Sequence, residues 1–290
     1  MTKKYKIGRF ELELPPDHML DKYQRQHRLY DWILGEIAKL IVSRYPDATM
    51  IDIGANVGDT AALLCRHCDV PILCIEGNPR FVEYLRRNVK RLPAVEVVEC
   101  LIGNSPGTVS IHDLKTVDGT ASLVDAHHAP RGGQEILIRP LADILREYTR
   151  FQRPKLIKTD TDGSDFEILR ASMNIIRDLK PILLFEYDPT FRKHGMQQAS
   201  STIAELGAAG YQYFFVYDNF GHFMRLIDKN QASEFMDLNR YLMSHLIFGR
   251  QIYYVDVLAI SVDDESLVFD LMKFHRAMIE HYVAQAGRQS

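Results

Sequence analysis

Short apolar runs alternate along the chain with longer segments in which apolar residues recur every three or four positions. The short runs are typical of strands buried on both faces, and the longer segments are typical of helices with one buried face. This alternation predicts an α/β protein with helices on both faces of a mainly parallel sheet. The predicted strands are Thr49–Ile53, Ile72–Glu76, Val95–Ile102, Leu156–Asp160 and Ile182–Glu186.

Helices are predicted after most of these strands. Pro79 suits the first turn of one of them, because the amide hydrogen that proline lacks would have no partner there. The predicted helices are Val57–Arg66, Pro79–Arg91, Leu141–Tyr148 and Asp165–Asp178.

The alternation lapses in the middle of the chain. Val109–His112 and Ile136–Ile138 are predicted as short strands that flank a polar loop. The loop is a candidate lid or substrate wall. His127, His128 and Arg131 within it are candidates for contacting substrate or supplying a base, and the alternative is that they are simply solvated.

Towards the C-terminus the pattern changes to two long strands, Tyr211–Tyr217 and Ile252–Ile260. A shorter strand-like segment, His222–Ile227, and a helix near Ala232–Leu246 lie between them. Two long strands so close in sequence predict an antiparallel hairpin with an insertion, which closes the sheet.

Helical segments are also predicted at both ends, at Leu20–Val42 and Leu267–Ala286. No internal repeat or linker rich in proline and glycine divides the chain. We therefore predict an N-terminal extension with a helix at residues 1–47, one α/β domain at 48–262 and a C-terminal helical tail at 263–290.

The 290 residues are 46% hydrophobic and 25% charged, which is the composition of an ordinary globular protein. A net charge of -3 gives no basic field for holding nucleic acid or an anionic membrane, so neither is expected as a partner. No apolar stretch is long enough to span a bilayer, and the basic N-terminus lacks the apolar stretch of a secretion signal. We expect a soluble, cytoplasmic protein.

Cys65 and Cys68 form a Cys-x-x-Cys sequence, a pattern found in redox and zinc sites. They lie at the far end of their predicted helix, whereas a redox pair gains its low thiol pKa at a helix N-terminus. Cys74 and Cys100 occupy inward positions of predicted strands, which does not suit further zinc ligands. We expect four reduced, structural thiols.

The most informative motif is the turn Ile51-Asp-Ile-Gly-Ala-Asn-Val-Gly-Asp59, which follows the first predicted strand. Gly54 and Gly58 would let backbone amides approach a ligand and let the next helix pack closely. The N-terminus of that helix favours a carboxylate. S-adenosylmethionine carries a carboxylate on its methionine end, and Asp52 could face its ammonium group.

Glu76 ends the next strand about 20 residues on, the interval at which an acidic side chain can bond ribose hydroxyls. The turn and Glu76 together predict a nucleoside site. A dehydrogenase that uses NAD shares this geometry, but Asn56 stands where its turn has a middle glycine. An NAD-dependent oxidoreductase and a plain tight βα connection are the weaker alternatives.

Four ordered segments resemble the motifs of the FkbM family of methyltransferases, over about Thr49 to Ile260. They are Ile51–Gly58, Ile75–Pro79, Leu156–Gly163 with Phe166–Leu169, and Asp256–Ile260. The resemblance implies a class I methyltransferase, Rossmann-like fold with a seven-stranded, mainly parallel sheet whose last strand is antiparallel. It also implies S-adenosylmethionine-dependent O-methylation of a hydroxyl on a sugar, glycan or natural product.

By matching position, the resemblance implies cofactor contacts from six residues, Asp52, Gly54, Asn56, Gly58, Glu76 and Asn78. Their neighbours Ala55, Asp59 and Gly77, together with Asp160, complete the cofactor-binding candidates. The family usually has Lys-Ile-Asp-Val-Glu-Gly-Ala-Glu where this chain has Lys158-Thr-Asp-Thr-Asp-Gly-Ser-Asp165. Asp160 matches the first Asp of the family, but Asp162 and Asp165 replace longer glutamates. The shorter side chains retract both carboxylates, so the preference for substrate or metal can differ from that of the family.

Methyl transfer to a hydroxyl needs a collinear arrangement, and either a general base or a divalent cation to activate the oxygen. Asp160, Asp162 and Glu186 all fall at carboxyl ends of predicted strands, where ligands of such sheets gather. Asp160 is the first candidate for the group beside the transferred methyl. Lys158 is assigned to packing on the opposite face of the strand.

Three converging carboxylates would repel one another without a proton or a cation, and hard oxygen ligands suit Mg²⁺. A metal-assisted sugar O-methyltransferase using Asp160, Asp162 and Glu186 is therefore one alternative. In the other, Asp162 and Asp165 cap the following helix and Asp160 alone is functional.

Three functions follow from these patterns. The first is O-methylation of a small-molecule or glycan acceptor, the second is nicotinamide-dependent oxidation, and the third is non-catalytic cofactor binding with the helical extensions serving partners. Tyr23 and His27, one helical turn apart, are candidates for roofing the pocket or for a plain helix surface. The oligomeric state, with a homo-oligomer as one option, stays open.

Overall fold

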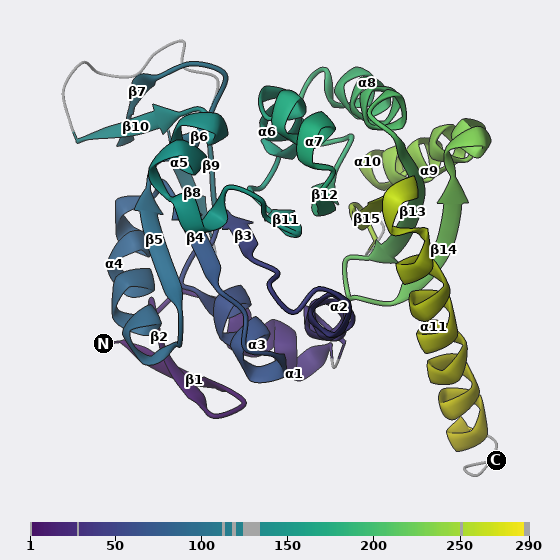
Figure 1. Cartoon of the computed structure of the whole chain (residues 1–290), viewed down its shortest axis with the longest axis horizontal. Helices are drawn as coiled ribbons and strands as arrows, with labels where there is room; N and C mark the ends of the chain where they lie inside the picture. The colour runs from purple at the N-terminus through teal and green to yellow at the C-terminus, as the bar shows by residue number, and fades with distance from the viewer. Residues whose placement is uncertain are drawn as a thin grey trace.

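The computed structural model of the chain describes residues 2–27, 29–111, 114–117, 120–123, 134–249 and 252–286. Its centre is an eight-stranded sheet with strand order β14-β13-β15-β12-β11-β3-β4-β5 (Figure 1). Five adjacent strands pair in parallel, namely β3 (Met50–Ile53), β4 (Ile72–Glu76), β5 (Val95–Glu99), β11 (Leu156–Thr159) and β12 (Ile182–Tyr187). The predicted α/β class with a mainly parallel sheet is confirmed.

The other three strands close the sheet at one side. They are β13 (Tyr211–Asp218), β14 (Phe223–Asp228) and β15 (Val255–Ser261). β15 lies between β12 and β13 and is antiparallel to both, as the predicted antiparallel last strand requires. The predicted number of seven strands is wrong for this sheet, because β14 folds back on β13 and adds an eighth strand at the edge.

Helices cover both faces of the sheet (Figure 1). Alternation along each strand builds two cores, since Leu156 and Leu184 join one cluster while Ile157 and Leu183 join the other. The first core is covered by α2 (Trp32–Arg44), α3 (Asp59–His67), α4 (Pro79–Asn88) and α11 (Glu265–Ala286). The second is covered by α5 (Leu141–Glu147), α6 (Asp165–Ala171), α7 (Met173–Leu179), α8 (Gly195–Ala208) and α9 (Ala232–Met243).

Two predicted helices are interrupted in the structure. The segment predicted as one helix over Asp165–Asp178 is divided at Ser172, where the backbone leaves the helical region. The N-terminal segment forms α1 (Leu20–Gln26) and α2, with Asp31 in a left-handed conformation at the start of α2. α8 has no counterpart among the predicted helices, and a short helix, α10 (His245–Phe248), follows α9.

The N-terminus also contains a β-hairpin that the sequence analysis missed, formed by β1 (Lys3–Ile7) and β2 (Phe10–Leu14). Leu12 and Leu14 are fully buried. The Asn88 side chain of α4 fastens the hairpin, because it donates to Glu13 O (3.0 Å) and Val57 O (2.8 Å) and accepts from Glu13 N (2.8 Å).

The middle of the chain forms two small sheets beside the main one. β6 (Leu101–Ile102), β10 (Glu135–Arg139) and β7 (Gly107–Ser110) make one, which confirms the two predicted short strands. β8 (Leu114–Val117) and β9 (Thr120–Leu123) make the other. The predicted loop residues His127, His128 and Arg131 lie outside the described residues.

The predicted C-terminal helix is present as α11, whose last turns extend away from the sheet (Figure 1). Within the described ranges, no helix is both long and apolar enough to cross a bilayer.

Candidate functional site

A cavity opens where the carboxyl ends of β3, β4 and β11 meet. Its lining brings together six of the predicted site residues, Gly54, Asn56, Glu76, Gly77, Asp160 and Asp162. Apolar side chains of Ile75, Phe81 and Leu101 complete the wall on the side of β4. The other predicted residues, Asp52, Ala55, Gly58, Asp59, Asn78 and Glu186, are not part of this lining.

Gly54 allows the backbones after β3 and β11 to approach closely. Its φ is +80°, and a Cβ atom at this position would lie 2.1 Å from the backbone oxygen of Asp160. Both its conformation and its surroundings therefore require glycine. Asn56, two residues on, has a φ of 49°, a region in which asparagine is the best tolerated of the larger residues.

The Glu76 carboxylate is held by backbone amides on both of its oxygens. Asn56 N donates to Oε2 at 2.8 Å, and Asn78 N donates to Oε1 at 2.7 Å. Burial nevertheless raises the pKa of Glu76 to about 7, because these bonds offset its desolvation only in part. Each oxygen keeps a further lone pair, so the oriented carboxylate can accept hydrogen bonds from a ligand in the cavity.

Two predicted cofactor residues have structural partners around this turn. Asn78 is the N-cap of α4, and its Oδ1 accepts a hydrogen bond from Arg80 N at 3.0 Å. Asn56 Oδ1 lies 3.2 Å from Nε2 of His18, a residue that the sequence analysis did not consider. Asp59 is the first residue of α3, and burial raises its pKa.

Lys158, on β11, points its ammonium group at two carboxylates. Nζ donates to Asp160 Oδ2 at 3.0 Å and lies 3.6 Å from Asp52 Oδ1. The predicted packing role on the opposite face was wrong, because residues two apart on a strand share a face. Burial lowers the pKa of Lys158, but Asp160 and Asp52 outweigh it and hold this pKa well above its usual value.

Asp52 is the most deeply buried acid of the site. Its side chain is 1% exposed, and neither carboxylate oxygen accepts a hydrogen bond from the described part of the chain. Burial raises the pKa of Asp52 to about 6, and the nearby Lys158 ammonium limits that rise. A buried carboxylate with no hydrogen bond is costly unless a ligand completes it.

Asp165 has a structural role. Its carboxylate accepts the Thr159 hydroxyl at 2.8 Å and the Thr161 hydroxyl at 3.0 Å, which ties the end of β11 to the first turn of α6. Burial raises the pKa of Asp165 to about 6, although the two hydroxyls oppose the rise. The shortening of this acid relative to the FkbM pattern therefore fits a contact to threonine.

Glu186 is the next-to-last residue of β12, outside the cavity lining, and lies across from Asp160, because Thr159 and Phe185 are register partners. Burial, followed by repulsion from Asp160, raises the pKa of Glu186 well above its usual value. Asp165 and Asp162 add to this rise, so the three predicted acids influence one another electrostatically. Among the described residues, no group of three or more His, Cys, Asp or Glu side chains is placed to hold a metal ion, so the metal-assisted alternative gains no support.

The N-terminal segment reaches the β13–β14 turn. The ring of His27 stacks on Phe220 with centroids 4.0 Å apart, and a Cβ on Gly221 would lie 2.3 Å from Leu29 O. Tyr30, at the end of this segment, is half-buried, and its desolvation raises its pKa, which Asp31 and Asp160 raise further. The segment therefore packs near the carboxyl ends of the strands, where a roof would lie.

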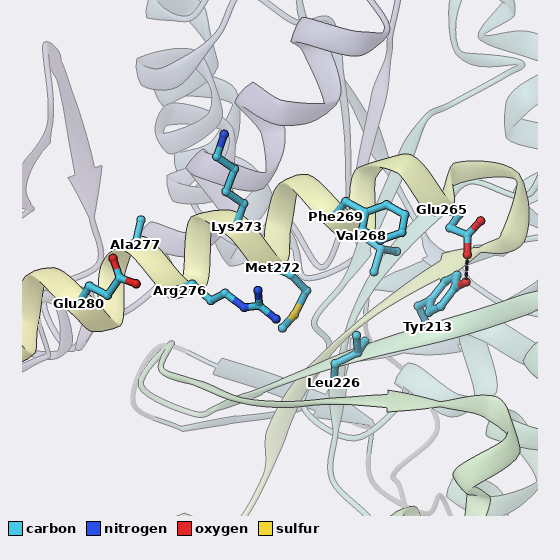
Figure 2. Close-up of a pocket in the computed structure, with 10 residues that line it drawn as sticks. All are labelled: Tyr213, Leu226, Glu265, Val268, Phe269, Met272, Lys273, Arg276, Ala277 and Glu280. Atoms are coloured by element: carbon cyan, nitrogen blue, oxygen red, sulfur yellow. Dashed lines mark hydrogen bonds between the residues drawn. The ribbon is translucent and has the colours of Figure 1, made fainter.

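Figure 2 shows a second hollow, of about 680 Å³, between α11 and the strands β13 and β14. Met272 of α11 points towards Leu226 of β14 across it, and Tyr213 is hydrogen-bonded to Glu265 at one end. None of the predicted cofactor or catalytic residues lines this hollow. Six of them line the cavity at the carboxyl ends of the strands instead.

The sequence profile of the methyltransferase FkbM domain matches residues 52–213, more than half of the chain. Comparison with curated proteins gives no match.

Several solved structures share similarity with the chain. An FkbM methyltransferase from Methylobacillus flagellatus is 21% identical, with a TM-score of 0.37, over 49% of this chain and 33% of that one. The chain thus spans 33% of the length of that protein. An O-methyltransferase from Bacillus cereus is 12% identical, with a TM-score of 0.43, over 85% of this chain and 92% of that one. A precorrin-6y C5,15-methyltransferase from Geobacter metallireducens is 14% identical, with a TM-score of 0.34, over 73% and 78%.

Proposed function

The chain belongs to the FkbM methyltransferase family, and we propose that it uses S-adenosylmethionine to methylate a hydroxyl oxygen of a sugar, glycan or natural product. The oriented carboxylate of Glu76 carries this proposal. Backbone amides hold it from both sides at the wall of the cavity, ready to accept the hydroxyls of a ribose.

The methionine end of the cofactor would lie towards β3 and the start of α3. The oxygens of Asp52 are buried without a hydrogen bond, and an ammonium group is the ligand chemistry that would complete them. The turn around Gly54, at the N-terminal end of α3, suits the carboxylate of the same ligand. The buried acid and the helix start thus fit the two charges of the amino-acid moiety.

When bound, S-adenosylmethionine supplies a methyl group on a positively charged sulfur. The protein has to position the acceptor oxygen in line and remove its proton. Asp160 lines the cavity with a side chain that is 45% exposed, and its carboxylate accepts a hydrogen bond from Lys158. We assign Asp160 to the acceptor hydroxyl, with Asp162 and Glu186 as its acidic neighbours.

A nicotinamide cofactor fits the turn less well. Asn56 occupies the place of the glycine that makes room for pyrophosphate, and its side chain is engaged with His18. S-adenosylmethionine has no pyrophosphate, so an asparagine at this place does not obstruct it.

Isothermal titration with S-adenosylmethionine and S-adenosylhomocysteine tests the cofactor assignment. Both should bind, and Glu76→Ala should weaken binding by about tenfold or more, because a charge-assisted hydrogen bond contributes roughly 1.5–3 kcal/mol. Glu99→Ala is the matched control, since Glu99 is the register partner of Glu76 on β5 but is exposed. Failure of the wild-type protein to bind either compound would refute the assignment.

Transfer of a radioactive methyl group to hydroxylated acceptors tests the reaction itself. We expect the label in an ether linkage on oxygen. A product methylated on nitrogen or carbon would contradict O-methylation while leaving cofactor binding intact.

A further inference from the structure

Beyond the cofactor cavity, two neighbouring strands place carboxylates opposite each other. Glu186 of β12 and Asp256 of β15 are register partners in an antiparallel pair. Such partners share a face of the sheet, with Cβ atoms about 4.5–5.5 Å apart, and like charges in these positions destabilise the sheet. No hydrogen bond or ion pair joins either side chain to another described residue, and burial and nearby charges are the causes that shift both pKa values.

Two further acids lie near this pair. Asp160 and Asp31 both raise the pKa of Asp256, after burial, the largest cause. Burial and nearby acids raise the pKa of Asp31 itself to about 7. We call Asp31, Asp160, Glu186 and Asp256 the acceptor carboxylates.

Among the described residues, Lys158 is the cation that lowers the pKa of Asp31 and of Asp256 within the acceptor carboxylates. The ammonium of Lys158 reaches this group, but it is hydrogen-bonded to Asp160 and also faces Asp52. Glu186 is 8% exposed, so water cannot compensate its charge well. A buried acid without a partner, facing a second acid, points to a cationic ligand.

We propose that Glu186 and Asp256 bind an ammonium group of the acceptor, so that the substrate is an amine-bearing hydroxyl compound such as an amino sugar. The inference rests on the proposed methyl transfer and narrows its substrate class. Bound there, the amine anchors the acceptor one strand away from Asp160, which faces the hydroxyl that receives the methyl group.

Two tyrosines support a cationic group over a neutral one. Tyr254, on the approach to β15, is close to Tyr30, Asp256 and Glu186, each of which raises its pKa after burial. An aromatic ring beside paired carboxylates is a favourable surrounding for an ammonium ion. A divalent cation fits less well, because Mg²⁺ demands near-octahedral oxygen ligands and the described residues offer no such cluster.

The test compares amines with matched neutral compounds on protein saturated with S-adenosylhomocysteine. The probes are glucosamine, galactosamine and mannosamine, each paired with its N-acetyl derivative, and the readout is thermal unfolding. Methyl transfer to the same probes is measured separately, with S-adenosylmethionine in place of S-adenosylhomocysteine. We expect the amines to raise the melting temperature and to accept the methyl group, and the N-acetyl derivatives to do neither.

Glu186→Gln and Asp256→Asn should each weaken amine binding about tenfold or more while leaving binding of S-adenosylhomocysteine unchanged. Because neither acid has a described partner, both variants should be at least as stable as the wild type. Asp178→Asn, an equal charge change at an exposed position of α7, is the control and should alter neither binding.

Equal responses to the amines and their N-acetyl derivatives, or no response to any amine, would overturn the inference. If Mg²⁺ stabilises the wild type and Glu186→Gln abolishes this stabilisation, the acids form a divalent cation site and the proposed ammonium site is refuted. A different result refutes the proposed function, namely that S-adenosylhomocysteine does not bind in the isothermal titration described above.

Discussion

Replacing Lys158 by methionine removes the ammonium group from between two carboxylates while keeping most of the volume of the side chain. Lys158 Nζ is 3.0 Å from Asp160 Oδ2 and 3.6 Å from Asp52 Oδ1. Asp160 is 45% exposed, so water solvates its carboxylate when Lys158 is absent. Loss of the Lys158–Asp160 ion pair should therefore lower the free energy of unfolding by well under about 1 kcal/mol. Asp52 is 1% exposed, and most of the effect falls on it.

Protonation of Asp52 sets an upper limit on the stability that Lys158→Met loses. In the folded wild type its pKa is about 6, and in the unfolded chain about 3.9. Because the folded pKa is raised, Asp52 lowers stability as the pH rises from about 4 to about 6, and its effect is then constant. In Lys158→Met the pKa of Asp52 rises further, so stability continues to fall above about pH 6.

In Lys158→Met, protonation of Asp52 removes the unpaired buried charge. This protonation costs about 1.36 kcal/mol for each pH unit above the wild-type pKa of Asp52, and the loss of stability cannot exceed that cost. The loss of stability should therefore be near zero at about pH 6 and reach at most about 3 kcal/mol at about pH 8. Urea unfolding followed through the fluorescence of Trp32, the one tryptophan of the chain, measures the difference at each pH.

Lys155→Met is the matched control. Lys155 lies just before β11, at the other end of that strand, and pairs with the buried Asp264 at 2.8 Å. This variant should also lose stability, yet it should bind S-adenosylhomocysteine as the wild type does. Lys158→Met should bind it differently, because the charge state of Asp52 changes. A stability loss for Lys158→Met that is the same at pH 6 and pH 8 would refute the reasoning.

Three further predictions concern other parts of the site and fold. Gly54→Ala should abolish cofactor binding and lower stability by about 2 kcal/mol or more, because its Cβ would meet Asp160 O at 2.1 Å; normal titration and unfolding curves would contradict this. Asn88→Ala removes three hydrogen bonds to the backbone of Glu13 and Val57 and should lower the free energy of unfolding in urea by about 2–4 kcal/mol. A loss below about 1 kcal/mol would show that the hairpin needs no such anchor. Because the folded protein raises the pKa of Glu76 to about 7, the stability that protonated Glu76 provides should be lost as the pH rises from about 4.5 to about 7. Glu76→Gln should flatten that part of the plot of stability against pH. An unchanged slope would contradict the raised pKa of Glu76.

The sequence predicted the parts of the site that depend on local pattern. The strand–turn–helix unit around Gly54 and the acid at the end of the next strand are encoded by apolar runs, glycine positions and one spacing. Each of these is a property of a few neighbouring residues, and the structure brings Gly54 and Glu76 to one cavity.

Some errors came from signals that were present in the sequence. Phe10, Leu12 and Leu14 alternate with polar residues, a period that predicts the second strand of the missed hairpin. Lys158 and Asp160 are two positions apart in a strand, which places them on one face, and this would have assigned Lys158 to the site.

The remaining features depend on contacts between segments far apart in the chain. Sequence alone determined that this chain forms a mainly parallel α/β sheet with a glycine turn after its first strand, because backbone geometry and apolar periodicity act locally. Only the tertiary structure decided that Asp256 stands opposite Glu186, that Asp31 approaches them, and that β14 extends the sheet. Strand register and the burial of charge arise when distant segments pack together, and no local pattern specifies them.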